Sequence, residues 1–229
     1  MSPKTGTSAE LWLIRHGESI GNREKIYQGQ NDLPLSPLGH HQASLLAERL
    51  ASLQEILPFS AIYSSDLQRA MQTAIPVSQA IGLPVRNRTG LREIDVGAWS
   101  GLTFADIQHR FPDEWAASYP VMDPDLVRGG GESYRQAQER VMRSLGEIAQ
   151  NHLGERVLVF FHGGVMQAAL AHIMHLPLPN KRFLQTANTS ISRVRLSPAN
   201  GILNGLILGM DDVAHLERTG QYLASVGPE

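Results

Sequence analysis

The sequence predicts an α/β fold, a three-layer α/β/α sandwich whose central sheet is mainly parallel. Short apolar runs typical of buried strands alternate with longer amphipathic segments typical of helices. This alternation favours parallel strands joined by right-handed helical crossovers. The 229 residues can bury a substantial core, and a content of 42% hydrophobic and 18% charged residues is ordinary for a globular fold. We expect one domain over residues 1–229.

The first half of the chain shows this alternation in order. We expect strands at residues 11–15, 61–65 and 84–87, separated by helices at 35–54 and 66–81. Ser36 followed by Pro37 is a typical helix start, and Gly82 ends the second helix.

The second half begins with a loop through "LREIDVGAWSG" and a short helix at 103–111, and it is loop-like over 112–131. "GGGES" opens a long amphipathic helix with Ser133 as its cap. The run "RVLVFF" at 156–161 is the strongest buried-strand signal, and a helix follows it over 163–175. Two more strands are expected at 191–197 and 202–210.

The bulk composition excludes several classes of function. A net charge of −2 gives no basic surface for nucleic acid. The absence of cysteine excludes disulfides, thiolate catalysis and cysteine-bound zinc. "MSPKTGTSAE" has no apolar core of a signal peptide, and no stretch reaches membrane-spanning length. We therefore expect a cytoplasmic protein with neither nucleic acid nor membrane as partner.

Three strand ends carry residues that could bind an anion. Arg15 and His16 end the first strand, Arg69 lies one helical turn after the second, and His162 follows "RVLVFF". Since parallel sheets bind ligands beyond the carboxyl ends of their strands, these side chains are expected at one edge. Guanidinium groups and helix N-termini favour phosphate, and Gly163 lets a ligand approach the backbone closely.

Histidine among arginines can also act as a nucleophile. The surrounding positive charge keeps the imidazole neutral, and attack on phosphorus would give a phosphohistidine. The leaving alkoxide then needs a proton from a carboxylic acid or another histidine. Glu93 in "LREID" is a candidate, although a solvated surface carboxylate or a role for the neighbouring Asp95 remains an alternative.

Five motifs in order carry a family resemblance. "LIRHGES" with Asn22, "YSSDLQRAMQTA", "LREIDVGAWSG", "GGGES" and "FFHGG" resemble the histidine phosphatase superfamily, which is phosphoglycerate mutase-like, from about residue 11 to 195. The resemblance implies one domain with a cap-like insertion around 99–131, no metal and no cofactor. It also implies the following roles: His16 as phosphorylated nucleophile, Glu93 as proton donor, Arg15, Arg69 and His162 in the phosphate pocket, Asn22 and the Gly163 backbone on the phosphoryl group, and Gln28 and Gly29 at the pocket wall.

One residue departs from the family pattern. Members commonly have a small residue before the second histidine, where this chain has Phe161. Because neighbouring strand residues alternate faces, we expect this ring to point into the core.

The cap distinguishes a phosphatase from a mutase. A phosphoglycerate mutase must hold a carboxylate, and sometimes a second phosphate, with cations. Residues 99–131 contain two basic residues, Arg110 and Arg128, against five acidic ones. The sequence therefore predicts a phosphomonoester phosphatase that acts on a small phosphorylated metabolite and releases inorganic phosphate. Phosphoglycerate mutase-type transfer is the alternative, and a non-catalytic phosphate-binding protein is another. The strands after Asn188 offer an edge for a homodimer.

Overall fold

The fold is built on a six-stranded sheet with the order β4-β3-β6-β1-β7-β8. The computed structural model describes residues 7–119, 122–199 and 202–217. The strands are β1 (Ala9–Arg15), β3 (Ala61–Ser64), β4 (Val85–Asn87), β6 (Arg156–Phe161), β7 (Ile191–Ala199) and β8 (Ile202–Asp212). Strands β4, β3, β6 and β1 pair in parallel, whereas β7 and β8 are antiparallel. The mainly parallel sheet that the sequence predicts is therefore confirmed.

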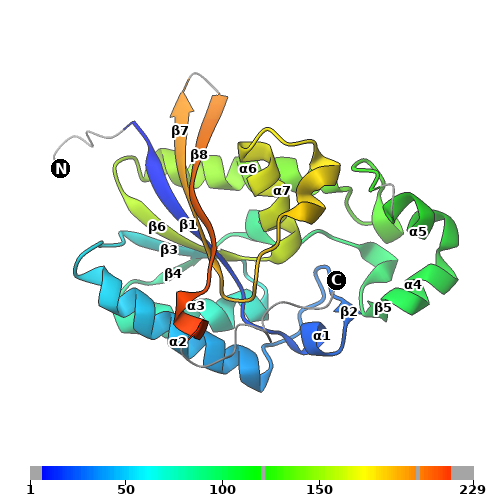
Figure 1. Ribbon diagram of the computed structural model, residues 1–229, viewed down its shortest axis with the longest axis horizontal. Coiled ribbons are helices and arrows are strands. Elements are labelled where there is room, and N and C mark those ends of the chain that lie inside the picture. The colour runs from blue at the N-terminus through cyan, green and yellow to red at the C-terminus, as the bar shows by residue number, and fades with distance from the viewer. Residues whose placement is uncertain (1–6, 120–121, 200–201, 218–229) are drawn as a thin grey trace.

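Helices cover both faces of the sheet. On one face lie α2 (Pro37–Gln54) and α3 (Gln68–Ile81), and on the other lie α6 (Tyr134–Asn151) and α7 (Gly163–Ile173) (Figure 1). Side chains along each strand point alternately to the two faces of the sheet, so each strand contributes to the core on both faces. In β1, Leu11 and Leu13 belong to one core cluster, and Trp12 and Ile14 belong to the other. The three-layer arrangement follows from this alternation.

Phe161 follows the same rule in β6. It is fully buried in the cluster that includes the α6 and α7 side chains, whereas Phe160 joins the opposite cluster. The expectation that Phe161 points into the core is confirmed.

Helices α2 and α6 begin, and α3 ends, where the sequence predicts, whereas α3 begins at Gln68 instead of residue 66 and α7 ends at Ile173 instead of residue 175. Ser36 accepts a hydrogen bond from the Gly39 amide at the start of α2, and Ser133 forms a capping box with Gln136 at the start of α6. Gly82 adopts the left-handed conformation that ends α3. These caps fix where α2 and α6 begin and where α3 ends.

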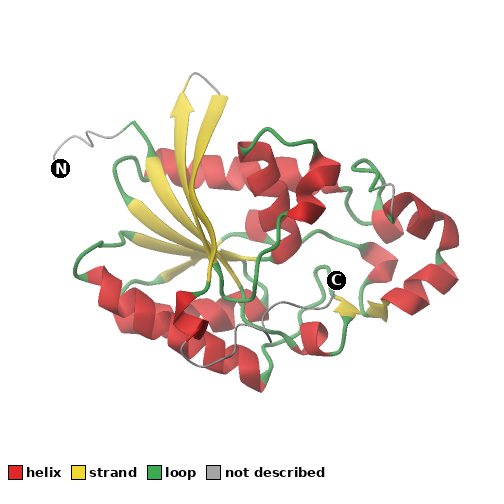
Figure 2. Cartoon of the chain, viewed as in Figure 1, coloured by secondary structure: helices red, strands yellow, loops and turns green. Residues whose placement is uncertain are grey.

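A smaller region lies to one side of the sheet, where α4 (Phe104–Arg110) and α5 (Pro112–Ser118) stand apart from the strands (Figure 2). It includes the two-stranded pair β2 (Ile26–Tyr27) and β5 (Leu102–Thr103). The expectation of a loop over 112–131 is wrong for α5. Pro112 occupies the first turn, and two acidic residues follow it there, which favours a helix start.

Several short elements complete the chain. They are α1 (Ile20–Arg23), α8 (Ala214–Glu217) and 3-10 helices at Thr89–Leu91, Gly97–Trp99, Arg128–Gly130 and Leu178–Phe183. None of the helices in the described ranges is both long and apolar enough to cross a membrane.

Candidate active site

Two histidines meet at the carboxyl ends of adjacent parallel strands. His16 follows β1 and His162 follows β6, and the His16 amide donates to the Phe161 carbonyl at 3.0 Å. Their ring centroids lie 5.2 Å apart with the planes inclined at 60°. The sheet thus brings together two residues that are separated by most of the chain, as the strand-end argument predicts.

The His16 ring is held in one tautomer. Its Nδ1 lies 2.7 Å from the Gly17 carbonyl oxygen, and since a carbonyl only accepts, Nδ1 carries the proton. Burial lowers the pKa of His16 well below its ordinary value, and the positive charges of Arg69 and Arg15 lower it further. His16 is therefore neutral, with a lone pair on Nε2.

Gly17 allows the turn after β1 to pack closely. A Cβ at this position would lie 2.7 Å from the Gly39 carbonyl oxygen, at the start of α2. The Gly17 amide donates to Thr73 Oγ1 at 3.0 Å. The glycine after His16 thus serves backbone packing between the strand end and two helices.

His162 is fully buried and is also neutral. Its Nδ1 accepts a hydrogen bond from Arg69 Nε at 3.2 Å, so the proton lies on Nε2, which is 2.8 Å from Ser65 Oγ. Burial lowers the pKa of His162 well below its ordinary value, and the charges of Arg69 and other nearby cations add to the effect. The two rings thus have opposite tautomers.

Arg69 links His162 to the loop after β2. Its Nη2 donates to the Gly29 carbonyl at 2.7 Å and its Nη1 to the Asn31 carbonyl at 2.8 Å. Burial lowers the pKa of Arg69 to about 10, which leaves the guanidinium charged at neutral pH. The Gly29 carbonyl therefore contacts the guanidinium that also bonds His162.

Arg15 has a buried donor that no described residue bonds. One of its Nη atoms donates to the Thr186 carbonyl, but its Nε is buried and makes no hydrogen bond within residues 7–119, 122–199 and 202–217. A Cβ at Gly163 would lie 3.1 Å from this Nε, so the bare glycine leaves room beside it. Because buried polar groups are nearly always bonded, the geometry points to an acceptor oxygen from a ligand.

Glu93 lies at the start of α7. Its Oε2 accepts from the Gly164 amide at 2.9 Å, and its Oε1 accepts from the amides of Val165 and Ile94, each at 3.0 Å. Two of the amides at the start of this helix therefore bond the carboxylate rather than lying open for phosphate. Sequence reasoning did not anticipate this arrangement.

The Asp95 side chain bonds within its own turn and not to the start of α7. Its carboxylate accepts from the Gly97 amide at 2.9 Å, while its backbone amide donates to Glu132. Of the two carboxylates that the sequence offers, Glu93 is the one that contacts the helix beginning beside His162.

Asn22 and Gln28 meet each other through Ser19. Ser19 Oγ lies 2.8 Å from Asn22 Oδ1 and 2.9 Å from Gln28 Oε1. In the part of the chain that the structure describes, no hydrogen bond joins Asn22 or Gln28 to His16 or His162. The structure thus places these two residues together, beside Gly29, without direct contact to the histidines.

Sequence reasoning missed the polar residues that hold the His16 backbone. Asn188 Nδ2 donates to the His16 carbonyl at 2.9 Å, and the Thr189 amide donates to the Arg15 carbonyl at 3.0 Å. Thr189 has a left-handed φ of 57°, and its Oγ1 lies 2.9 Å from His215 Nε2. The polar run "TANTS" just before a buried strand is the signal that could have revealed them.

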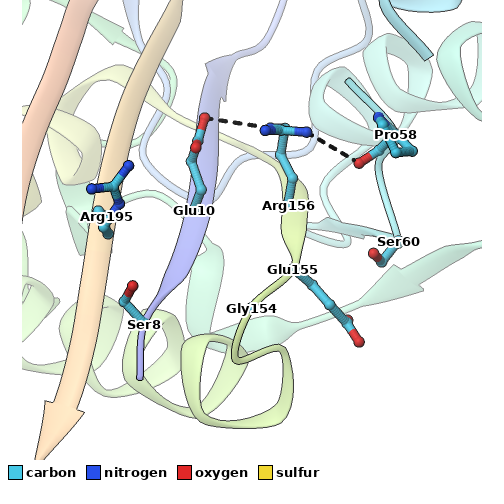
Figure 3. A pocket seen from close by; sticks show the side chains of 8 residues that line it. All are labelled: Ser8, Glu10, Pro58, Ser60, Gly154, Glu155, Arg156 and Arg195. Atoms are coloured by element: carbon cyan, nitrogen blue, oxygen red, sulfur yellow. Dashed lines mark hydrogen bonds and ion pairs between the residues drawn. The ribbon is translucent and has the colours of Figure 1, made fainter. Parts of the chain in front are cut away.

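A surface pocket lies at the opposite edge of the sheet, near the amino ends of β1 and β6 (Figure 3). Its wall contains Arg156, which donates to the Glu10 carboxylate and to the Pro58 carbonyl. It is lined by Ser8, Glu10, Pro58, Ser60, Gly154, Glu155, Arg156 and Arg195. None of these residues belongs to the histidine site.

Comparison with known proteins adds three relatives. A family model described as histidine phosphatase superfamily (branch 1) matches residues 11–206. The metal-independent phosphoserine phosphatase of Arabidopsis thaliana is 34% identical over 212 residues, covering 92% of this chain and 84% of the relative. Phosphoglycerate mutase-like protein 4 of the same plant is 36% identical over 221 residues, covering 96% and 92%. A mycobacterial glucosyl-3-phosphoglycerate phosphatase, solved with inorganic phosphate, superposes with a TM-score of 0.75 at 30% identity, covering 90% and 98%.

Proposed function

The chain belongs to the histidine phosphatase superfamily, and from this we propose that it is a phosphomonoester phosphatase that works through a phosphohistidine on His16. One observation carries the proposal. A buried, neutral His16 with a lone pair on Nε2 feels the charges of the buried Arg69 and of the half-buried Arg15, whose Nε is buried and makes no hydrogen bond within the described residues. This is an anion pocket that contains a nucleophile.

The first step transfers the phosphoryl group to the protein. His16 Nε2 attacks phosphorus, and the bond from phosphorus to the substrate's ester oxygen breaks. Arg15, Arg69 and the Gly163 backbone hold the phosphoryl oxygens, with His162 beside them. The carboxyl group of Glu93 gives its proton to the departing oxygen.

The second step releases inorganic phosphate. Glu93, now a carboxylate, takes a proton from water as that water attacks the phosphohistidine, and the bond from phosphorus to His16 Nε2 breaks. Asn22 contacts the phosphoryl group, and Gln28 and Gly29 form the wall of the pocket. No metal or cofactor takes part.

Hydrolysis of p-nitrophenyl phosphate in the presence of a chelator tests the proposal. We expect turnover by the native chain and loss of at least about a thousandfold in His16→Ala, because the covalent step has no other nucleophile. Full activity in His16→Ala would refute the mechanism, and no turnover of any phosphomonoester would favour a non-catalytic phosphate-binding protein.

Mutase activity is the second candidate, because one close relative carries the name phosphoglycerate mutase-like. The acidic character of residues 99–131 favours water as acceptor instead. Conversion of 3-phosphoglycerate into 2-phosphoglycerate faster than release of phosphate would establish the mutase.

The sequence also supports the proposed substrate class, the cap and a dimer surface. The substrate is a small phosphorylated metabolite in the cytoplasm, with no nucleic acid or membrane involved. Residues 99–131 act as a cap on a single domain, and the edge strand β8 offers a surface for a homodimer.

A further inference from the structure

Two buried cations lie against one tyrosine ring beside the phosphate pocket. The Lys181 ammonium is 3.6 Å and the Arg128 guanidinium carbon 4.2 Å from the centroid of the Tyr134 ring. Arg128 is 1% and Lys181 4% exposed. Arg128 lies in the predicted cap and Lys181 in the 3-10 helix after α7, so the fold brings together cations far apart in sequence.

These charges have no acidic partner in the part of the chain that the structure describes. None of the ion pairs within the described ranges includes Arg128 or Lys181. Among the described residues, the Arg128 side chain donates one hydrogen bond, to the Leu126 carbonyl. A cation stacked on an aromatic ring is partly stabilised, but two buried charges on one ring still favour an anion.

The electrostatics of Tyr134 agree with this picture. Burial raises the pKa of its phenol, but the charges of Lys181 and Arg128, together with the hydrogen bond to Tyr27, lower it, and the net pKa lies below the ordinary value. The cluster is therefore a region of positive potential.

One hydrogen bond connects the cluster to the segment beside the proposed phosphate pocket. The Tyr134 hydroxyl lies 3.4 Å from that of Tyr27, which directly precedes Gln28 and Gly29. The negative charge of Glu93, the proposed proton donor, also acts on Tyr134 and raises the pKa of its phenol. The cations are therefore close to residues that would surround a bound substrate.

We propose that Arg128 and Lys181 form a subsite for a second anionic group of the substrate, a carboxylate or a second phosphate on the leaving group. This inference rests on the proposed phosphatase function and specifies its substrate class. It also revises the sequence-based view of the cap, in which Arg128 was only one of two cations outnumbered by acids, because Lys181 comes from outside that segment.

Matched substrates test the subsite through selectivity. One pair is 3-phosphoglycerate and glycerol 3-phosphate, in which a hydroxymethyl group replaces the carboxylate. The other pair is 1,3-propanediol bisphosphate and 3-hydroxypropyl phosphate. We expect kcat/KM to favour the anionic member of at least one pair by about tenfold or more, and the pair that shows the preference identifies the anion.

Lys181→Met should reduce that selectivity ratio by about tenfold, mainly through KM, because the side chain keeps its length and loses its charge. Lys181→Arg keeps the charge and should keep the preference, which decides the question if the Met variant fails to fold. Lys25→Met is the matched control, since it removes the same charge from an exposed position, and its ratio should equal that of the native chain.

Equal kcat/KM within both pairs, or an unchanged ratio in folded Lys181→Met, would overturn the subsite while leaving the phosphatase intact. If the native chain hydrolyses no phosphomonoester, the phosphatase proposal fails, and calorimetric binding then tests the subsite. Tighter binding of 3-phosphoglycerate than of glycerol 3-phosphate, lost in Lys181→Met, would support it, and equal binding would contradict it.

Discussion

Replacing Glu93 with glutamine tests the assignment of the proton donor. The carboxylate accepts three backbone hydrogen bonds, from Ile94, Gly164 and Val165. Glutamine has the same shape and keeps one acceptor oxygen, but it cannot give a proton at neutral pH. The substitution therefore removes proton donation by this side chain. It disturbs the start of α7 only where the amide nitrogen of glutamine replaces one of the two carboxylate oxygens.

The two effects differ in size. Loss of a general acid costs about 10² to 10⁴ in rate, or about 3 to 5 kcal/mol in transition-state stabilisation. Loss of one acceptor facing a backbone amide costs about 1 to 3 kcal/mol of folding stability. Activity on an alkyl phosphate such as phosphoserine should therefore fall at least about a hundredfold in a variant that still folds.

Comparing substrates with different leaving groups distinguishes loss of proton donation from loss of substrate binding. The p-nitrophenolate anion leaves without a proton, so Glu93→Gln should slow the hydrolysis of p-nitrophenyl phosphate by about tenfold or less. Asp95→Asn is the matched control, because among the described residues its carboxylate bonds within its own turn, to the Gly97 amide, and it should retain nearly full activity on both substrates. A larger loss in Asp95→Asn than in Glu93→Gln, or equal losses on both substrates in Glu93→Gln, would refute the assignment.

Three further substitutions probe the support of the site. Asn188→Ala removes the donor to the His16 carbonyl and should lower kcat about tenfold with little change in KM, as measured by steady-state kinetics. Gly163→Ala places a Cβ 3.1 Å from Arg15 Nε, so KM should rise severalfold, and an unchanged KM would show that this Nε does not bind substrate. The pKa of His215 is lowered to about 4, so below about pH 6.5 the unfolded chain binds a proton that the folded chain excludes, and stability falls as pH drops. His215→Gln should weaken that fall between about pH 6.5 and 4 in urea unfolding curves.

The sequence predicted the residues whose position depends on strand ends. His16 and His162 directly follow strands with continuous apolar runs, and parallel pairing alone brings such positions to one edge. The helix caps at Ser36 and Ser133 could also be predicted, because a cap and the amide it bonds are close in sequence.

Contacts between segments that are distant in sequence could not be predicted in this way. The bonds from Asn188 and Thr189 to the β1 end depend on the antiparallel pairing of β7 with β1. Arg128 and Lys181 meet on Tyr134 only through tertiary packing. The helix α5 has seven residues, too few to show a clear helical period, so the sequence does not distinguish it from a loop.

Trapping of the covalent intermediate tests the central claim most directly. The native chain is mixed with a phosphomonoester, quenched within milliseconds, and examined by mass spectrometry under alkaline conditions that preserve phosphohistidine. We predict one acid-labile phosphoryl group on His16, present in Glu93→Gln and absent in His16→Ala. Turnover without any label on His16, or a label on His162 instead, would contradict the account.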